Sequence, residues 1–149
     1  MTKGKLARQY FEQGYNCAQA VACAFAEEMN MSVEQIARLA SCFGAGIGRM
    51  RETCGAFTGA LIVYGYFKGN DVAEDQQAKQ ATYAAVQRFM IPFTDKFGTL
   101  ICRDLLGEEG KGPITPTPAP RDEHYKAVRP CPGIVEAAAD MMEEFLKNN

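Results

Sequence analysis

The chain has 149 residues, and its 16 lysines and arginines stand against 18 aspartates and glutamates, which gives a formal net charge of −2. A chain of this length suits one domain, which can bury a sizeable core without disulfide bonds. The near-neutral charge argues against a nucleic-acid-binding protein, which usually carries a basic patch. Hydrophobic residues make up 47% and charged residues 23% of the chain, a mixture typical of a globular protein, so we expect residues 1–149 to form a single domain.

Helical patterns dominate the sequence, whereas strand patterns are sparse. Asn16 is a candidate N-cap, and Ser32 with Gln35 has the spacing of a capping box, which marks the start of a helix. Pro92 is expected to end or kink the helix that leads to it. The predicted helices cover residues 4–13, 17–29, 33–42, 54–68, 71–89, 99–106 and 132–147.

Proline is concentrated shortly before the last predicted helix. Six of the seven prolines lie between residues 107 and 132, which predicts an extended loop with at most one short helical turn near residues 123–127. Long irregular connections within compact domains are uncommon and are often functional. The predicted fold is therefore all-α: a single-domain bundle of about six or seven helices with a Pro-rich loop before the last helix.

The unusual feature of the composition is six cysteines beside one histidine and no tryptophan. The longest apolar run near the N-terminus, residues 20–26, is followed by two glutamates rather than by a signal-peptide cleavage site. No stretch approaches the ~18 consecutive apolar residues of a membrane span, so we expect no membrane insertion and a cytoplasmic location. Thiols normally stay reduced there, so the cysteines are expected to be packing residues, metal ligands or redox groups.

Three cysteines fall at the starts of predicted helices. Cys17 follows the candidate cap Asn16, Cys54 follows Thr53, and Cys131 immediately precedes a proline. The first turn of a helix has unpaired N–H groups and a partial positive charge, and both favour the thiolate. At such positions the pKa of a cysteine can fall from about 8.5 to ~3.5–7.5. Arginines also lie within three residues of Cys54 and Cys131.

The other cysteines and their spacing exclude familiar sites. Cys23 and Cys42 stand among apolar residues and are expected to be packing residues. The chain has no C-x-x-C pair, which leaves a thioredoxin-type motif and a zinc ribbon unsupported, and the ferredoxin-type cysteine runs are absent. Any disulfide or metal site must therefore gather cysteines from distant segments.

Two further features of the sequence are candidate functional sites. The glycine-rich segment 44–48 follows a predicted helix rather than a strand, so dinucleotide binding is not expected. A tight turn that brings Arg49 and Cys54 against another helix is the preferred interpretation. His124 is the single histidine, and we expect it to be a solvated or packing residue of the Pro-rich loop.

Three segments resemble a known family. They are residues 16–21 (NCAQAV), 43–49 (FGAGIGR) and 54–61 (CGAFTGAL), followed by Cys102 and by Cys131 ahead of the last helix. Together they resemble the C_GCAxxG_C_C family, small redox-active proteins named for four cysteines and a central glycine-containing element. The resemblance spans roughly residues 15 to 146. Thr53 stands where the family name has glycine.

The resemblance implies that Cys17, Cys54, Cys102 and Cys131 act together in thiol–disulfide exchange or electron transfer, as in an oxidoreductase. Cys54 is the preferred reactive thiolate, because it has a predicted cap, nearby arginines and adjacent glycines. Cys131 is the preferred resolving partner, because it follows a flexible loop. Four cysteines allow three complete disulfide pairings, and nothing in the sequence ranks them.

Two alternatives stay open. In the first, Cys17, Cys54, Cys102 and Cys131 are ligands of a metal ion or an iron–sulfur cluster. In the second, the protein is a non-catalytic helical interaction module whose cysteines merely pack. Dithiol chemistry would need no cofactor, and its partner would be another redox protein or a small thiol. A homo-oligomer is compatible with the sequence.

Overall fold

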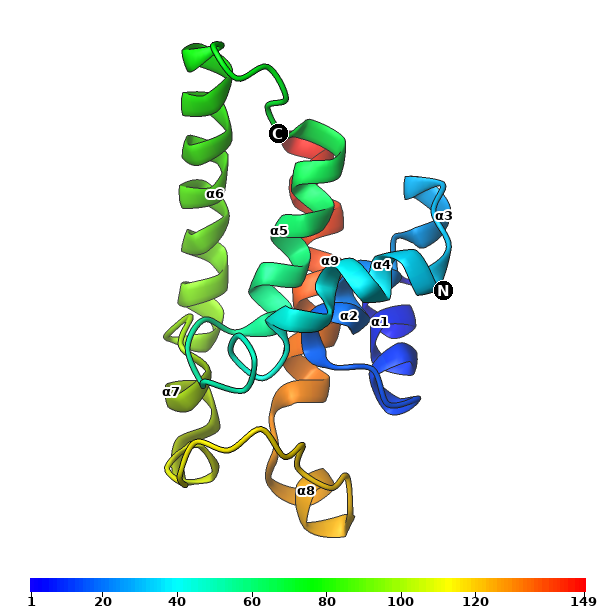
Figure 1. The fold of residues 1–149 in the computed structure, drawn as a ribbon, viewed down its shortest axis with the longest axis vertical. Helices are drawn as coiled ribbons and strands as arrows, with labels where there is room; N and C mark the ends of the chain where they lie inside the picture. Colours follow the sequence, from blue (N-terminus) through cyan, green and yellow to red (C-terminus); the bar gives the residue numbers. More distant parts are fainter.

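The structure is a computed structural model that describes residues 1–149, and it is helical throughout (Figure 1). It contains nine α-helices, two 3-10 helices and one isolated β-bridge, so the all-α prediction is confirmed and the expected six or seven helices are too few. None of the helices has the combination of length and apolarity that crossing a membrane requires. In chain order the elements are α1 (Lys3–Glu12), α2 (Cys17–Cys23), α3 (Ala26–Met29), α4 (Val33–Ala40), η1 (Ser41–Phe43), α5 (Gly55–Lys68), α6 (Gln76–Phe97), α7 (Cys102–Leu106), η2 (Gly107–Gly110), α8 (Glu123–Val128) and α9 (Cys131–Asn148).

Two helix boundaries differ from the sequence-based expectation. The helix expected over residues 17–29 is divided into α2 and α3, because the chain makes a tight turn at Phe25, whose amide donates to the Ala22 carbonyl. Pro92 lies inside α6 and does not end it. A proline removes one helical hydrogen bond, and the buried Phe89 and Phe93 on either side anchor both halves of the helix in the core.

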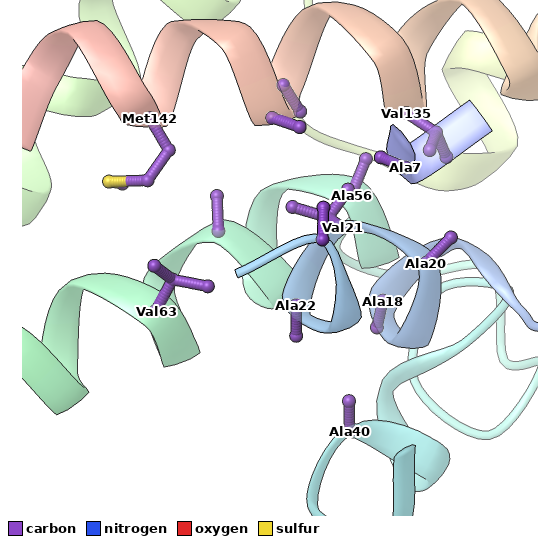
Figure 2. Packing of buried hydrophobic residues seen from close by; sticks show 14 of the residues in the cluster. Ala7, Ala18, Ala20, Val21, Ala22, Ala40, Ala56, Val63, Val135 and Met142 are labelled. Atoms are coloured by element: carbon purple, nitrogen blue, oxygen red, sulfur yellow. The ribbon is translucent and has the colours of Figure 1, made fainter. Parts of the chain in front are cut away.

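Helix α2 lies at the centre of the bundle and packs against α1, α4, α5 and α9. Its buried face is made of small side chains, including Ala18, Ala20 and Ala22, which are fully buried (Figure 2). Figure 2 shows them near Ala40 of α4 and Ala56 of α5. Small side chains allow neighbouring helix backbones to approach closely, so the alanine-rich sequence of α2 determines how tightly the surrounding helices close around it.

An aromatic cluster attaches the long helix α6 to the bundle. Phe57 of α5 stacks on Phe89 of α6 with ring centroids 5.6 Å apart, and it also contacts Phe93 at 5.3 Å. Phe145 of α9 meets Phe89 edge-on at 5.2 Å. Burial of these rings is a large hydrophobic contribution, and their offset and edge-on contacts add to it.

Helices α5 and α9 run in the same direction, so both begin at the same end of the molecule (Figure 1). Residues 111–122 form neither helix nor strand and cross this end between η2 and α8. The glycine-rich segment between η1 and α5 also loops across this end, below the start of α5. Loops and helix N-termini are therefore gathered at one end of the bundle. The four cysteines that are expected to act together lie at helix starts there.

Candidate functional site

An antiparallel pairing of two short segments, centred on the isolated β-bridge, connects Cys54 and Cys102. The Cys54 amide donates to the Leu100 carbonyl at 2.7 Å, and the Cys102 amide donates to the Glu52 carbonyl at 2.6 Å. Side chains in such a pairing alternate between its two faces, and the residues next to the bridged pair share one face. Cys54 and Cys102 therefore project from the same face, although 48 positions separate them in the chain.

Four cysteines converge from the starts of four helices. Cys17, Cys102 and Cys131 are the first residues of α2, α7 and α9, and Cys54 is the N-cap of α5. All four line one apolar cavity of about 20 Å³, here called the cysteine cavity, and all four are free thiols. Its remaining walls are Ala56, Leu105, Leu106, Ile134 and Val135. This space is too small for a substrate, and it is lined by side chains of all four cysteines.

The glycine-rich segment forms a left-handed turn beside the cysteines. Residues 45–49 all have positive φ, between 53° and 77°, and Arg51 follows with φ 61°. A left-handed conformation costs roughly 1–2 kcal/mol at each residue other than glycine. At Gly46 a side chain would also come within 2.7 Å of the Cys102 Cβ. Strain of this kind persists only where surrounding structure enforces it, and it clusters at functional sites.

A second cavity of about 550 Å³ opens beside the cysteines, and three of them line it: Cys17, Cys102 and Cys131. Four arginines also line it, so it is called here the arginine cavity; they are Arg49, Arg51, Arg121 and Arg129. Its walls come from the left-handed turn, from residues 116–121 and from α8. Small-molecule sites are commonly 300–1,000 Å³. The arginine cavity therefore has the size of a substrate site, and Cys54 lies behind it.

Arg51 lies beside Cys102, which lines both cavities. It is the one charged residue among the buried ones, with 7% of its surface exposed, and its Nη1 lies 3.8 Å from the Cys102 sulfur. A positive charge is therefore held next to this sulfur. Arg51 also belongs to the strained segment, with φ 61°, so the strained turn contributes a side chain to the site.

Burial dominates the ionisation of the other three cysteines. It raises the pKa of Cys17 to about 11 and that of Cys54 to about 12, and it also raises the pKa of Cys131. The backbone N–H groups of Phe57 and Ala56 oppose this effect at Cys54, and the Tyr125 hydroxyl opposes it at Cys131. The helix-start positions are confirmed, but the expected fall in pKa is wrong for these cysteines, because desolvation outweighs the helix N-termini.

The sulfur groups also act on one another. After burial, the neighbours that raise the pKa of Cys54 are Cys17 and Cys102. Cys131 and Cys102 act in the same way on Cys17, and Cys102 does so on Cys131. Such mutual effects require short distances, since like charges disfavour ionisation only when they are close. The four thiols therefore form one electrostatically coupled cluster.

A family model described as "Putative redox-active protein (C_GCAxxG_C_C)" matches residues 15–145. The chain belongs to the C_GCAxxG_C_C family. No curated protein and no solved structure matches it significantly. The four cysteines that the resemblance singles out are the four that line the cysteine cavity.

The geometry explains the Cys-Gly-Ala-x-x-Gly segment that begins at Cys54 and carries the resemblance to the family. Gly55 and Gly59 lie one turn apart on α5 and face α2. A side chain at Gly55 would collide with the Cys17 sulfur, and one at Gly59 would come within 2.5 Å of the Ala18 carbonyl oxygen. The two glycines therefore let α2 approach α5 closely enough to bring Cys17 beside Cys54.

The remaining candidates lie outside the cluster. Cys23 is buried with 1% of its surface exposed, as expected for a packing residue. Cys42 is exposed, so its predicted packing role is wrong: it lies in η1, where the chain leaves α4 and turns toward the surface. His124 is solvated and contacts Glu109 at 3.2 Å. In this structure no three Cys, His, Asp or Glu side chains are arranged to hold one metal ion.

Proposed function

We propose that this protein carries out thiol–disulfide exchange through Cys17, Cys54, Cys102 and Cys131. The observation that supports this function is the convergence of the four thiols on one small cavity, from which three of them also face a cavity of substrate size. Thiol–disulfide exchange needs thiols that can reach one another and a path by which the partner reaches one of them. Both requirements are met at this end of the bundle.

Cys102 is the better candidate for the attacking thiolate. Its sulfur lies 3.8 Å from the Arg51 guanidinium, and it lines the arginine cavity. Cys54, the preferred nucleophile at the level of the sequence, lines only the cysteine cavity, and burial raises its pKa to about 12. The thiolate is the attacking species in exchange, so both access and charge favour Cys102 over Cys54.

Cys131 is the proposed resolving cysteine. It lines both cavities. Burial raises the pKa of the Cys131 thiol, and the neighbouring Cys102 raises it further. The Cys102 thiolate attacks one sulfur of an incoming disulfide, forms a mixed disulfide and releases the first partner thiolate. Cys131 then loses its proton and attacks the Cys102 sulfur, which releases the second thiolate. Two electrons pass to the partner. The released thiolates take up the proton from Cys131 and one proton from the solvent, which received the Cys102 proton when that thiol ionised.

Cys17 and Cys54 form the proposed inner pair. Besides burial, Cys17 has the largest effect in raising the pKa of Cys54, and the glycine next to Cys54 admits the Cys17 sulfur. The outer disulfide can be reduced by this inner pair through a second exchange. The cluster would then hold two pairs of electrons in its fully reduced state.

The test is anaerobic titration of the reduced protein with hydroxyethyl disulfide, followed by alkylation of the remaining thiols and peptide mass spectrometry. We expect the Cys102–Cys131 disulfide to form first. Cys23 should remain a free thiol, and therefore be alkylated, at every stage of the titration. Cys102→Ser should prevent oxidation at the arginine cavity. Cys42→Ser, which removes an exposed cysteine outside the cluster, is the matched control and should behave as the wild type. Unchanged oxidation of Cys102→Ser would refute the assignment.

Four thiolates are a common ligand set, so binding of a metal ion or an iron–sulfur cluster is the alternative function, although no three ligands are arranged around one ion in this structure. Anaerobic purification followed by iron, zinc and sulfide analysis separates the two functions. Stoichiometric metal, lost on substitution of any of the four cysteines but retained in Cys42→Ser, would support the metal-binding function and contradict exchange. Metal-free protein with four thiols that oxidise reversibly would support exchange.

A further inference from the structure

The arginine cavity holds more positive charge than its surroundings neutralise. Of its four arginines only Arg129 forms a salt bridge, with its Nε 3.1 Å from Glu109. The one carboxylate that lines the cavity belongs to Glu12, which is paired with Arg8 at 3.3 Å. Arg51 is buried and has no carboxylate partner. Arg51 contacts the Cys102 sulfur, but Arg49 and Arg121 have no anionic partner in this structure, so an anion in the cavity would be stabilised.

The arginines lie close enough to repel one another. Burial lowers the pKa of Arg49, and the nearby Arg51 and Arg129 lower it further. Such crowding of like charges is maintained by the fold, since Arg49 and Arg51 both belong to the strained left-handed turn. An anionic ligand would relieve the repulsion at all of these positions at once.

The guanidinium groups are also held in place before any ligand arrives. Arg121 lies over the Phe11 ring at 3.8 Å and donates to the Tyr15 carbonyl at 2.8 Å. The Arg49 Nη1 donates to the carbonyl and the hydroxyl of Thr115 at 2.9 and 3.0 Å. A guanidinium has five N–H donors and binds carboxylates through paired hydrogen bonds. Arg49 therefore keeps its Nη2 and Nε donors for a ligand in a fixed orientation.

We propose that the arginine cavity binds a small disulfide that carries carboxylate groups, with the carboxylates on Arg49 and Arg121 and the sulfur–sulfur bond at Cys102. This proposal rests on the exchange function above and names the substrate class for it. The volume of about 550 Å³ suits a molecule the size of a short acidic peptide disulfide. The substrate gains two electrons and leaves as two thiols, while Cys102 and Cys131 form a disulfide, as in the steps given above.

A series of small disulfides that differ in charge tests whether the arginine cavity prefers anionic substrates. The reduced protein is mixed with dithiodipropionate, hydroxyethyl disulfide or cystamine, which are anionic, neutral and cationic, and the loss of protein thiols is followed. Each rate is divided by the rate of the same disulfide with dithiothreitol, which removes intrinsic reactivity. We expect the normalised rate to be about tenfold higher for the anionic than for the cationic disulfide, and to converge at high salt. Equal normalised rates would overturn the proposal.

Matched variants test whether the preference for anionic disulfides arises in the arginine cavity. Arg49→Gln and Arg121→Gln should lower the ratio of anionic to neutral rates by about threefold or more. Arg88→Gln removes the same charge from the exposed face of α6, where Arg88 contacts Asn149, and it should leave the ratio unchanged. A ratio that falls equally in all three variants would reflect net charge alone and contradict the site.

A binding measurement separates this proposal from the exchange function. The double variant Cys102→Ser, Cys131→Ser lacks the proposed exchanging pair, and calorimetric titration with oxidised glutathione measures binding without that reaction. Saturable binding that Arg49→Gln weakens would support the anion site even if exchange by the wild type were absent. Normal exchange without binding or charge preference would retain the exchange function and refute the anion site.

Discussion

The guanidinium Nη1 of Arg51 lies 3.8 Å from the sulfur of Cys102, although 51 positions separate these buried residues in the chain. The contact is fixed by the backbone, because the amide of Arg103 donates to the Arg51 carbonyl at 3.2 Å and the amide of Cys102 donates to the Glu52 carbonyl. The pairing of the two segments therefore fixes the backbone positions from which the Arg51 side chain reaches the Cys102 sulfur.

This relationship predicts the effect of Arg51→Gln. We expect alkylation of Cys102 by iodoacetamide at neutral pH to slow about tenfold, since the variant removes the positive charge beside the sulfur, and an adjacent arginine makes a cysteine more reactive. Peptide mass spectrometry after timed alkylation measures the rate at Cys102 alone. Gln is shorter than Arg but is likewise unbranched at Cβ, so we expect the left-handed turn to be retained.

Arg103→Gln is the control for Arg51→Gln. Arg103 is next to Cys102 in sequence, but its side chain is exposed and pairs with Glu52 at 2.8 Å. We expect little change in the alkylation rate of Cys102 in this variant. Equal effects of the two substitutions would show that general charge, and not the buried contact, controls the thiol.

The raised pKa values of the buried cysteines predict a loss of stability at alkaline pH. The thiol of Cys54 has a pKa of about 12 in the folded protein, raised by burial and by Cys17 from an ordinary value of 9.0. Between these values the unfolded chain releases this proton while the folded chain retains it, so the free energy of unfolding falls as pH rises. The full slope for one such group is about 1.4 kcal/mol per pH unit.

Urea unfolding of the reduced protein across about pH 8 to 10.5 measures this slope. Cys54→Ala should reduce the slope, because one of the groups with a raised pKa is gone while Cys17 and Cys131 remain. Cys42→Ala, at an exposed position, should leave the slope as in the wild type. A slope that Cys54→Ala does not change would contradict the burial of a neutral thiol at this position.

The sequence predicted much of the local structure, because the signals are local. The Ser32–Gln35 capping box and the Asn16 cap are both present. Three of the four site cysteines were expected at helix starts from neighbouring cap residues. Only the family resemblance indicated Cys102, and its helix begins at Cys102 itself, where no side chain makes a capping hydrogen bond. Its position depends on pairing with residues near Cys54, which the sequence around Cys102 does not encode.

The ionisation and the cavities could not be predicted, because both depend on tertiary packing. Helix N-termini favour thiolates, yet the pKa of Cys54 is raised because apolar side chains from other helices exclude water around it. The glycine-rich segment indicated a tight turn, and the turn does bring an arginine into the site. The arginine at the Cys102 sulfur is Arg51, whereas Arg49, which was expected to lie against another helix, donates to Thr115 of the long loop.

The contact between α2 and α5 predicts the effect of Gly59→Ala. The added methyl would come within 2.5 Å of the Ala18 carbonyl oxygen and 2.9 Å of its Cα, so the two helices must separate. We expect a loss of about 1–3 kcal/mol in the free energy of unfolding, as for overpacked cores. Slower oxidation of Cys17 and Cys54 should accompany it, since the same contact brings these two thiols together.

Gly65→Ala provides a control on the same helix. Gly65 is an interior residue of α5, it is exposed, and nothing lies within 4 Å of the position that a side chain would occupy. Alanine there should raise the free energy of unfolding by about 0.5–1 kcal/mol through helix propensity. Urea unfolding distinguishes the two variants by the sign of the change, and equal signs would show that the α2–α5 contact is not tight.

The left-handed turn predicts the effect of Ile47→Gly. Ile47 is β-branched, has φ 68° and exposes 42% of its surface, so it combines strain with little burial. Glycine would relieve roughly 1–2 kcal/mol of strain and would lose about 0.5–1 kcal/mol through the entropy of the unfolded chain. We therefore expect a net rise in the free energy of unfolding of up to about 1 kcal/mol in urea titrations.

Ile91→Gly is the matched control, because Ile91 is also exposed but lies in helix α6, next to Pro92, and does not have a positive φ. The same substitution there relieves no strain and should lower the free energy of unfolding by about 1 kcal/mol. If Ile47→Gly is stabilising but slows exchange at Cys102, the strain is maintained for the site, since a looser turn holds Arg51 less firmly. A destabilisation as large as that of Ile91→Gly would show that the turn is not strained at Ile47.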